Sequence, residues 1–251
     1  MSETTDNEEG YVGTLALNRN ELLLPNYNEY VVSLITSFWL KHQHPTMSAN
    51  FKIMDFGAGL GTLSTAFEHR NNVKVDCFEI DHDLIEILKQ KNLNTYSQIE
   101  QINNCYDLIY SSNVIEHIKD DAGAIASMKK MLKPNGLLIL FVPAFNSLYS
   151  RIDSELGHYR RYTIPELRTK LQKQGFETPE ARYCDSMGFL AWYVAKLLKI
   201  NQNMNKRVSI SLKIFDKIIL PISKKIDQAF PNIHFGKNLL IVGIKKEDEN
   251  Q

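Results

Sequence analysis

Three glycines at alternate positions form the stretch of the chain with the clearest chemical use. Gly57, Gly59 and Gly61, with Ala58 between the first two, follow a short apolar run that contains Asp55. A buried parallel strand that breaks into a tight loop and then feeds a helix has this pattern. Glycines let a ligand approach the main chain closely, and the amides of the next helix face the same crevice. The stretch therefore predicts a nucleotide-type ligand at the carboxyl edge of a sheet.

An acidic residue after the next apolar run refines this prediction. The run over 73–78 leads into Glu79 and Ile80, and Glu79 comes 24 residues after Asp55, close to the roughly 20 expected for an acid that binds ribose. Glu79 can accept from the 2′- and 3′-hydroxyls, which favours NAD or an adenosyl cofactor over NADP. Asp55 can order the loop and accept from an ammonium group through loop amides or water. The dinucleotide fingerprint needs a third glycine where this chain has Thr62.

These side chains need a sheet and its helices to bring them to one edge. Apolar residues at helical spacing predict helices over about 26–42, 62–70, 84–89, 120–132, 163–174, 187–200 and 210–230. Short apolar runs predict strands near 52–54, 73–78, 94–96, 107–111, 137–142, 177–183 and 239–244. Asn26 is the expected cap of the first helix, and Thr163 that of the helix at 163–174.

Several motifs, in order, resemble those of the class I S-adenosylmethionine-dependent methyltransferases. They are D-F-G-A-G-L-G at 55–61, F-E-I-D at 78–81, Y-D-L-I-Y-S-S-N-V-I-E-H-I at 106–118 and M-L-K-P-N-G-L-L-I-L at 131–140, with Asn135 where a glycine is usual. The resemblance implies an α/β fold with a Rossmann-like, seven-stranded, mostly parallel sheet and helices on both faces. It also implies S-adenosyl-L-methionine as cofactor, bound by Tyr27, Asp55, Gly57, Ala58, Gly59, Gly61, Glu79, Ile80 and Asn113.

Two of these residues, Asn113 and Tyr27, can be assigned to a portion of the cofactor. Asn113 follows the strand at 107–111, whose carboxyl end lies beside the glycine loop, so we expect it near the amino-acid portion of the cofactor. Methyltransferases of this type often carry an N-terminal helix that closes over the cofactor, so the resemblance implies that Tyr27 and Asn28 touch the methionine end. The alternative is a helix cap followed by a core aromatic residue. Ser97 and Gln98 are the candidates for contact with adenine.

The connection over 145–162 is dense in aromatic and ionisable residues, and it leaves the strand next to the predicted methyl donor. Long loops with such content at this edge are usually functional. We expect His158 to be the base or the group that orients the acceptor, with Arg160 and Arg161 holding an anionic part of it. One arginine could instead pair with an acid at position 153 or 155. The segment G-H-Y-R-R-Y-T resembles one in a bacterial, type 11/12-like subgroup often associated with sugar or cell-surface pathways.

A second histidine follows the strand at 107–111. In one interpretation Glu116 is a charge favoured at the start of a helix and His117 is a surface residue. In the other, His117 lies at the mouth of the site and is the rival base. No cluster with metal-ligand spacing is evident in the sequence, so no metal is expected.

The composition excludes some classes of protein. Lys+Arg 29 balances Asp+Glu 29, so no overall basic field is available to hold nucleic acid. Three scattered cysteines without zinc or disulfide spacing indicate a reducing compartment, and we expect a cytoplasmic protein. The start of the chain is acidic and polar, unlike a signal peptide, and no apolar stretch reaches the roughly 18 residues of a membrane span.

The expected organisation is a disordered tail over 1–10 and one methyltransferase domain over 11–251, with a helical insertion at about 185–232. The apolar helices within 187–230, with several lysines, predict a lid, a dimer contact or a peripheral membrane contact.

The expected reaction is in-line transfer of a methyl group to a small-molecule, sugar or lipid-linked acceptor, at oxygen or nitrogen. Two alternatives remain open: an NAD-dependent oxidoreductase, and a non-catalytic partner subunit that binds the cofactor.

Overall fold

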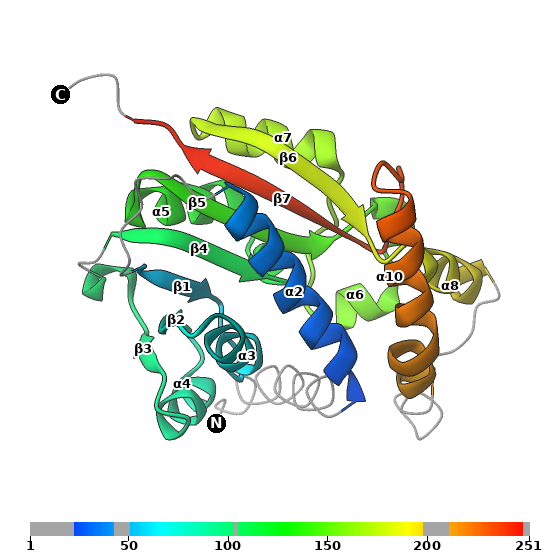
Figure 1. The fold of residues 1–251 in the computed structure, drawn as a ribbon, viewed down its shortest axis with the longest axis horizontal. Coiled ribbons are helices and arrows are strands. Elements are labelled where there is room, and N and C mark those ends of the chain that lie inside the picture. Colours follow the sequence, from blue (N-terminus) through cyan, green and yellow to red (C-terminus); the bar gives the residue numbers. More distant parts are fainter. Residues whose placement is uncertain (1–22, 43–50, 103–104, 198–210, 248–251) are drawn as a thin grey trace, which may run out of the picture.

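The computed structural model describes residues 23–42, 51–102, 105–197 and 211–247, which are built around one seven-stranded sheet (Figure 1). The strand order is β3-β2-β1-β4-β5-β7-β6. Strands β1 to β5 pair in parallel, and β7 runs antiparallel to both β5 and β6. The strands are β1 Ile53–Phe56, β2 Val75–Phe78, β3 Asn94–Tyr96, β4 Tyr106–Ser112, β5 Leu132–Pro143, β6 Phe176–Cys184 and β7 Asn238–Lys245. The predicted Rossmann-like α/β fold is confirmed.

Helices cover both faces of this sheet, as predicted (Figure 1). The α-helices are α2 Pro25–His42, α3 Thr62–Asn71, α4 His82–Gln90, α5 Asp121–Met131, α6 Arg151–Glu155, α7 Ile164–Lys173, α8 Ser186–Leu197 and α10 Leu220–Ala229. Short 3-10 turns are η1 Ile99–Gln101, η2 Ile115–His117 and η3 Asn146–Leu148, and η4 Phe215–Ile219 is a π-helix. None of the described helices has the length and apolar character that crossing a bilayer requires.

Strand β5 shows how the sequence forms two core layers. Its residues Leu138, Leu140 and Val142 pack with α5 and α7 on one face. The alternate residues Leu137, Ile139 and Phe141 pack with α2 and α3 on the other face. All are buried, which explains why the strand reads as a continuous apolar run rather than an alternating one.

The sheet reverses its strand order between β1 and β4, which are direct neighbours. Chain connections diverge from this point, because β1 leads towards β2 and β3 while β4 leads towards β5. Ligands of open α/β sheets bind outside the carboxyl ends of the strands at such a reversal. The fold therefore places its crevice where the glycine loop and Asn113 leave the sheet.

The start of helix α2 differs from the prediction. Asn26 lies within the first turn, so the expectation that it caps the helix is wrong. The buried carboxylate of Asp216 in η4 accepts instead from the backbone amides of Asn26 and Tyr27, at 3.2 and 2.9 Å. These amides have no partner within the helix, and an anion at this end is favoured by the helix dipole. The cap therefore comes from a distant part of the chain.

The expected cap of α7 is confirmed. Thr163 and Glu166 form a capping box, with Pro165 in the first turn.

The helical insertion lies between β6 and β7, as predicted, and consists of α8, η4 and α10 in the described residues. In Figure 1 these helices lie together at the end of the sheet that is opposite α5. The tail predicted at 1–10 lies outside the described residues, as do residues 198–210 of the predicted insertion.

Candidate active site

The glycine loop after β1 depends on its glycines for shape and space. Gly57, Gly59 and Gly61 have φ values of 82°, 56° and 72°, in the left-handed region that side chains disfavour. A Cβ on Gly57 would also lie 2.4 Å from a methyl group of Val114. The amides of Gly57 and Ala58 donate to the Phe78 carbonyl at 2.8 and 3.1 Å. The loop is thus held between the ends of β2 and β4.

The Glu79 carboxylate turns towards this loop. One oxygen accepts from the Gly59 amide at 2.8 Å, and the other accepts from the amides of Ile80 and Asp81 at 2.8 and 3.0 Å. A carboxylate has about four lone-pair sites, so one remains for a ligand hydroxyl. The neighbouring Ile80 is 77% exposed, the highest value among the large apolar side chains of the described residues. An acid for ribose beside an open apolar side chain for adenine fits an adenosyl ligand.

Asp55 lies beneath the loop rather than in the crevice. It is buried and accepts from the Ser64 hydroxyl of α3 at 2.6 Å. Burial raises the pKa of Asp55 to about 7, although the Ser64 hydrogen bond opposes the rise. Its contact therefore supports the predicted role in ordering the loop, and any contact with the cofactor would pass through the loop.

Asn113 stands at the carboxyl end of β4, where the sequence places it. Its φ of 54° is left-handed, its amide donates to the Phe141 carbonyl at 2.8 Å, and its side chain is exposed at the edge of the sheet. The next residue, Val114, packs on Gly57, so the backbone at Asn113 lies close to the glycine loop.

Tyr27 projects from the start of α2 onto the same end of the sheet. Its hydroxyl accepts from the Asn238 side chain at 3.0 Å, and its ring contacts Phe141 edge-on with centroids 6.4 Å apart.

The adenine candidates, Ser97 and Gln98, both hydrogen-bond to Gln101, whose side-chain oxygen accepts from their two backbone amides.

Asp153 in α6 holds the loop over 145–162 in place. One of its oxygens accepts from the amide and hydroxyl of Ser150 at 2.8 and 3.0 Å. The other accepts from Arg161 Nε at 2.7 Å and lies 3.1 Å from His158 Nδ1. Burial opposes ionisation, but the hydrogen bonds of His158 and Arg161 and the charge of Arg161 hold the pKa of Asp153 well below its usual range.

Both arginines of this loop have partners within the protein. Arg161 is buried and pairs with Asp153, which confirms the alternative in which one arginine is structural. Arg160 forms an ion pair with Asp121 at 2.8 Å and also donates to a backbone carbonyl. The expectation that the two guanidinium groups hold an anionic part of the acceptor gains no support from this arrangement, because protein oxygens already occupy them.

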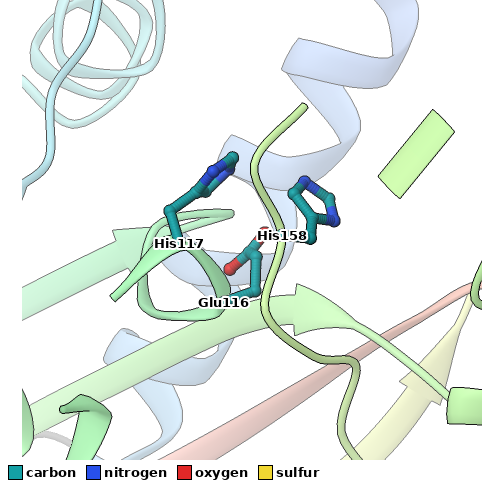
Figure 2. A group of neighbouring side chains, drawn as sticks. All are labelled: Glu116, His117 and His158. Atoms are coloured by element: carbon teal, nitrogen blue, oxygen red, sulfur yellow. The ribbon is translucent and has the colours of Figure 1, made fainter. Parts of the chain in front are cut away.

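Figure 2 shows the side chains of Glu116, His117 and His158 converging from two segments. Turn η2, after β4, supplies the first two, and the loop over 145–162 supplies His158. The two imidazole centroids are 4.5 Å apart at an interplanar angle of 86°. The Tyr159 amide donates to the Glu116 carbonyl at 2.8 Å and so fastens the loop to the turn. The two candidate bases of the sequence analysis are therefore neighbours in one cluster.

Glu116 is the acidic member of this cluster and was not predicted as a site residue. It is fully buried rather than an exposed charge at a helix start, and no hydrogen-bond partner among the described residues reaches either carboxylate oxygen. Burial raises the pKa of Glu116 to about 8. Loss of solvent and the neighbouring His158 lower the pKa of His117 to about 4, although its side chain remains partly exposed at the surface.

Lys237 is a second residue that the sequence analysis missed. Its ammonium nitrogen lies 5.6, 5.4 and 4.9 Å from the ring centroids of Tyr27, Trp192 and Phe215. Such contacts between a cation and aromatic rings are attractive. Burial lowers the pKa of Lys237, and the nearby charge of Asp185 opposes the change. No local signal could have found this group, because its rings come from α2, α8 and η4.

A family model described as a methyltransferase domain matches residues 23–181, which is more than half of the chain. The chain belongs to this methyltransferase family. Together with the fold and the adenosyl-type site, this makes it an S-adenosylmethionine-dependent methyltransferase, and an NAD-dependent oxidoreductase is not supported.

Comparison with individual proteins agrees with this family. The ubiquinone biosynthesis O-methyltransferase of Rickettsia canadensis (strain McKiel) is 28% identical over 120 residues, which is 45% of this chain and 48% of that protein. The matched segment thus spans about half the length of the curated relative.

Solved structures of methyltransferases share the fold at lower identity. A SAM-dependent methyltransferase from Archaeoglobus fulgidus has a TM-score of 0.54 at 17% identity, covering 87% of this chain and 94% of that one. Phosphoethanolamine N-methyltransferase 2 of Haemonchus contortus, in complex with S-adenosyl-L-methionine, has a TM-score of 0.53 at 15% identity, covering 84% and 52%.

Replacing the acid that holds the acceptor loop should destabilise the protein strongly. Asp153→Ala leaves Arg161 buried without its partner, so we expect the free energy of unfolding to fall by about 3–5 kcal/mol in urea denaturation. Glu155→Ala is the matched control in the same helix, because its ion pair with Arg151 is exposed. Equal losses for the two variants would contradict the role of Asp153.

The buried Asp55 carboxyl should make stability depend on pH. Its folded pKa of about 7 lies above the ordinary 3.8, so its contribution is present at low pH and is lost as pH rises through 7. Between pH 5.5 and 8, unfolding free energy of the wild type should fall by about 2 kcal/mol more than that of Asp55→Asn. Urea melts at both pH values measure this difference, and parallel pH profiles for the two proteins would refute it.

Proposed function

We propose that the chain transfers the methyl group of S-adenosylmethionine to a small-molecule, sugar or lipid-linked acceptor that enters beside the loop over 145–162. The observation that carries this proposal is the cluster of Glu116, His117 and His158 at the carboxyl end of β4. The cofactor residues lie at the same edge of the sheet, beside the end of the same strand. Acceptor and donor would therefore meet over β4.

The residues of the cofactor side fit the adenosyl group. Glu79 keeps one lone-pair site for ribose, Ile80 offers an apolar surface for adenine, and the loop from Gly57 to Gly61 gives close access to the backbone. Asn113 and Tyr27 would contact the methionine portion. When bound, the cofactor supplies a methyl group on a positively charged sulfur, which is already electrophilic. The protein must then align the acceptor and exclude water.

His158 is the residue that we assign to activation of the acceptor. Its Nδ1 faces the buried carboxylate of Asp153, which fixes the orientation of the ring and leaves Nε2 available. When a carboxylate holds one nitrogen of a histidine ring, the other nitrogen is positioned to accept or donate a proton. Within the described residues no carboxylate forms such a hydrogen bond with His117, and its lowered pKa makes it a weak base.

The protein would work in a reducing compartment such as the cytoplasm. Its three cysteines, Cys77, Cys105 and Cys184, are free, and the described residues contain no disulfide.

Two substitutions should separate cofactor binding from turnover. Glu79→Ala removes the ribose acceptor, so the dissociation constant for S-adenosylmethionine should rise by about 10-fold or more in calorimetric titration. His158→Ala should lower methyl transfer by about 100-fold or more and leave that dissociation constant within about twofold of wild type. Turnover is measured as transfer of labelled methyl into fractionated metabolites.

Two exposed residues provide the controls for this experiment. Glu86→Ala removes an acid of α4, and His69→Ala removes a histidine of α3; both side chains point to solvent, and both variants should behave as wild type. Full turnover in His158→Ala would remove this residue from the site. Unchanged affinity in Glu79→Ala would remove the acid from the cofactor contact.

The membrane or dimer contact predicted for 187–230 stays a prediction. It is supported by exposed apolar side chains on α8 and around η4, namely Leu190, Tyr193, Val194, Leu197, Ile214, Ile218 and Ile222. If this surface binds anionic vesicles or a second copy, Val194→Glu should abolish flotation with vesicles or the dimer seen by light scattering. A wild type that is monomeric and stays unbound with vesicles would rule out both contacts.

A further inference from the structure

We infer that Glu116, His117 and His158 form a binding site for a divalent first-row transition metal such as Zn²⁺. The three side chains each offer one ligand atom, and these atoms all lie within 4.8 Å of one another. This inference goes beyond the sequence, which shows no metal-ligand spacing, because His158 comes from a different segment. Metal binding itself does not depend on the proposed function; only the catalytic role of the metal rests on it.

The separations suit a metal after a small adjustment. Zn²⁺ binds histidine nitrogen and carboxylate oxygen at about 2.1 Å, which places tetrahedral ligands about 3.4 Å apart. Since the separations are at most 4.8 Å, no pair of ligand atoms needs to approach by more than about 1.4 Å, which side-chain torsions can provide. In Figure 2 the Glu116 carboxylate is drawn between and below the two imidazoles, so the three groups surround one point.

The unpartnered carboxylate is independent evidence for a ligand. Glu116 is fully buried, and neither of its oxygens has a hydrogen-bond partner within the described residues. A buried carboxylate in this condition is costly, and buried charges are normally paired or bound to metals. A cation at the cluster would supply the missing partner.

The imidazole of His158 is also held in the way that metal ligands are held. Metal-binding histidines usually donate their second ring nitrogen to a carboxylate or a backbone carbonyl. His158 Nδ1 lies 3.1 Å from the Asp153 carboxylate, which leaves Nε2 for a metal. His158 thus has one ring nitrogen held within the protein and the other left for a metal.

The ligand types select among metals. Two imidazoles and one carboxylate suit zinc, iron, cobalt or nickel, whereas Mg²⁺ and Ca²⁺ prefer oxygen ligands throughout. Three protein ligands leave at least one coordination position open, as in catalytic rather than structural zinc sites. His117 is exposed, so the cluster can be reached from the surface.

An acceptor with a hydroxyl group would occupy that open position. Coordination of the hydroxyl oxygen lowers its pKa, so its proton leaves to solvent. The oxygen then forms the new bond to the methyl carbon as the bond between that carbon and sulfur breaks, and the sulfur keeps the electron pair. In the metal-loaded protein His158 therefore acts as a ligand, and acceptors with hydroxyl groups are favoured over amines.

Metal binding can be measured without any acceptor. Tag-free protein, stripped with a chelator and dialysed, is titrated with Zn²⁺ by calorimetry and with Co²⁺ by absorption in the visible range. We expect one metal per chain, a cobalt spectrum typical of low coordination number, and no comparable binding of Mg²⁺. Glu116→Gln and His158→Ala should each weaken Zn²⁺ binding by about 10-fold or more.

The control and the contrary outcomes separate this inference from the proposed function. His69→Ala removes an exposed histidine and should bind Zn²⁺ as wild type does. Circular dichroism and S-adenosylmethionine titration report whether each variant is folded. Absent or non-stoichiometric metal binding by a wild type that binds the cofactor, or undiminished binding by both folded cluster variants, would overturn the metal site and leave the methyltransferase assignment intact. If the wild type bound the metal and did not bind the cofactor, the metal site would stand and the proposed function would be overturned.

Discussion

The buried carboxylate of Asp153 is the interaction on which the acceptor side of the site depends. It accepts hydrogen bonds from Ser150 at the start of α6, from Arg161 and from His158, and these partners span positions 150–161 of the loop. A loop of this length has no sheet ladder to hold it, so a central acceptor with several donors takes that role. The side chain of His158 is thereby oriented from within the protein, and only its outer nitrogen is left for chemistry.

The cofactor side is held by a different principle. There the hydrogen bonds join the backbone of the glycine loop to the end of β2 and to the Glu79 carboxylate. Both carboxylate oxygens of Glu79 accept from main-chain amides. These contacts need only glycines and one acid, and they form between neighbouring parallel strands. The two halves of the site meet at β4, because Val114 packs on the glycine loop while Glu116, two residues later, binds the acceptor loop through its carbonyl.

This difference explains what could be predicted from the sequence. The glycine loop, Glu79 and Asn113 could be located because each follows a recognisable strand and the order of parallel strands fixes their common edge. The cap of α2 could not, since Asp216 lies 190 positions from Asn26. The burial of Glu116 and the rings around Lys237 were missed for the same reason. Each depends on packing between segments that are remote in sequence and carry no shared pattern.

The burial of Glu116 is informative because it lowers the stability of the folded protein. A buried carboxylate without donors costs about 1–3 kcal/mol or more, whereas an apolar residue of similar size would pack there without that cost. Elsewhere in the described core, acids such as Asp55, Asp121 and Asp153 have hydrogen-bonding partners. Glu116 is an exception that lies beside two histidines, one of them oriented by Asp153, at the carboxyl end of a strand in a methyltransferase. A ligand of positive charge explains this better than packing does.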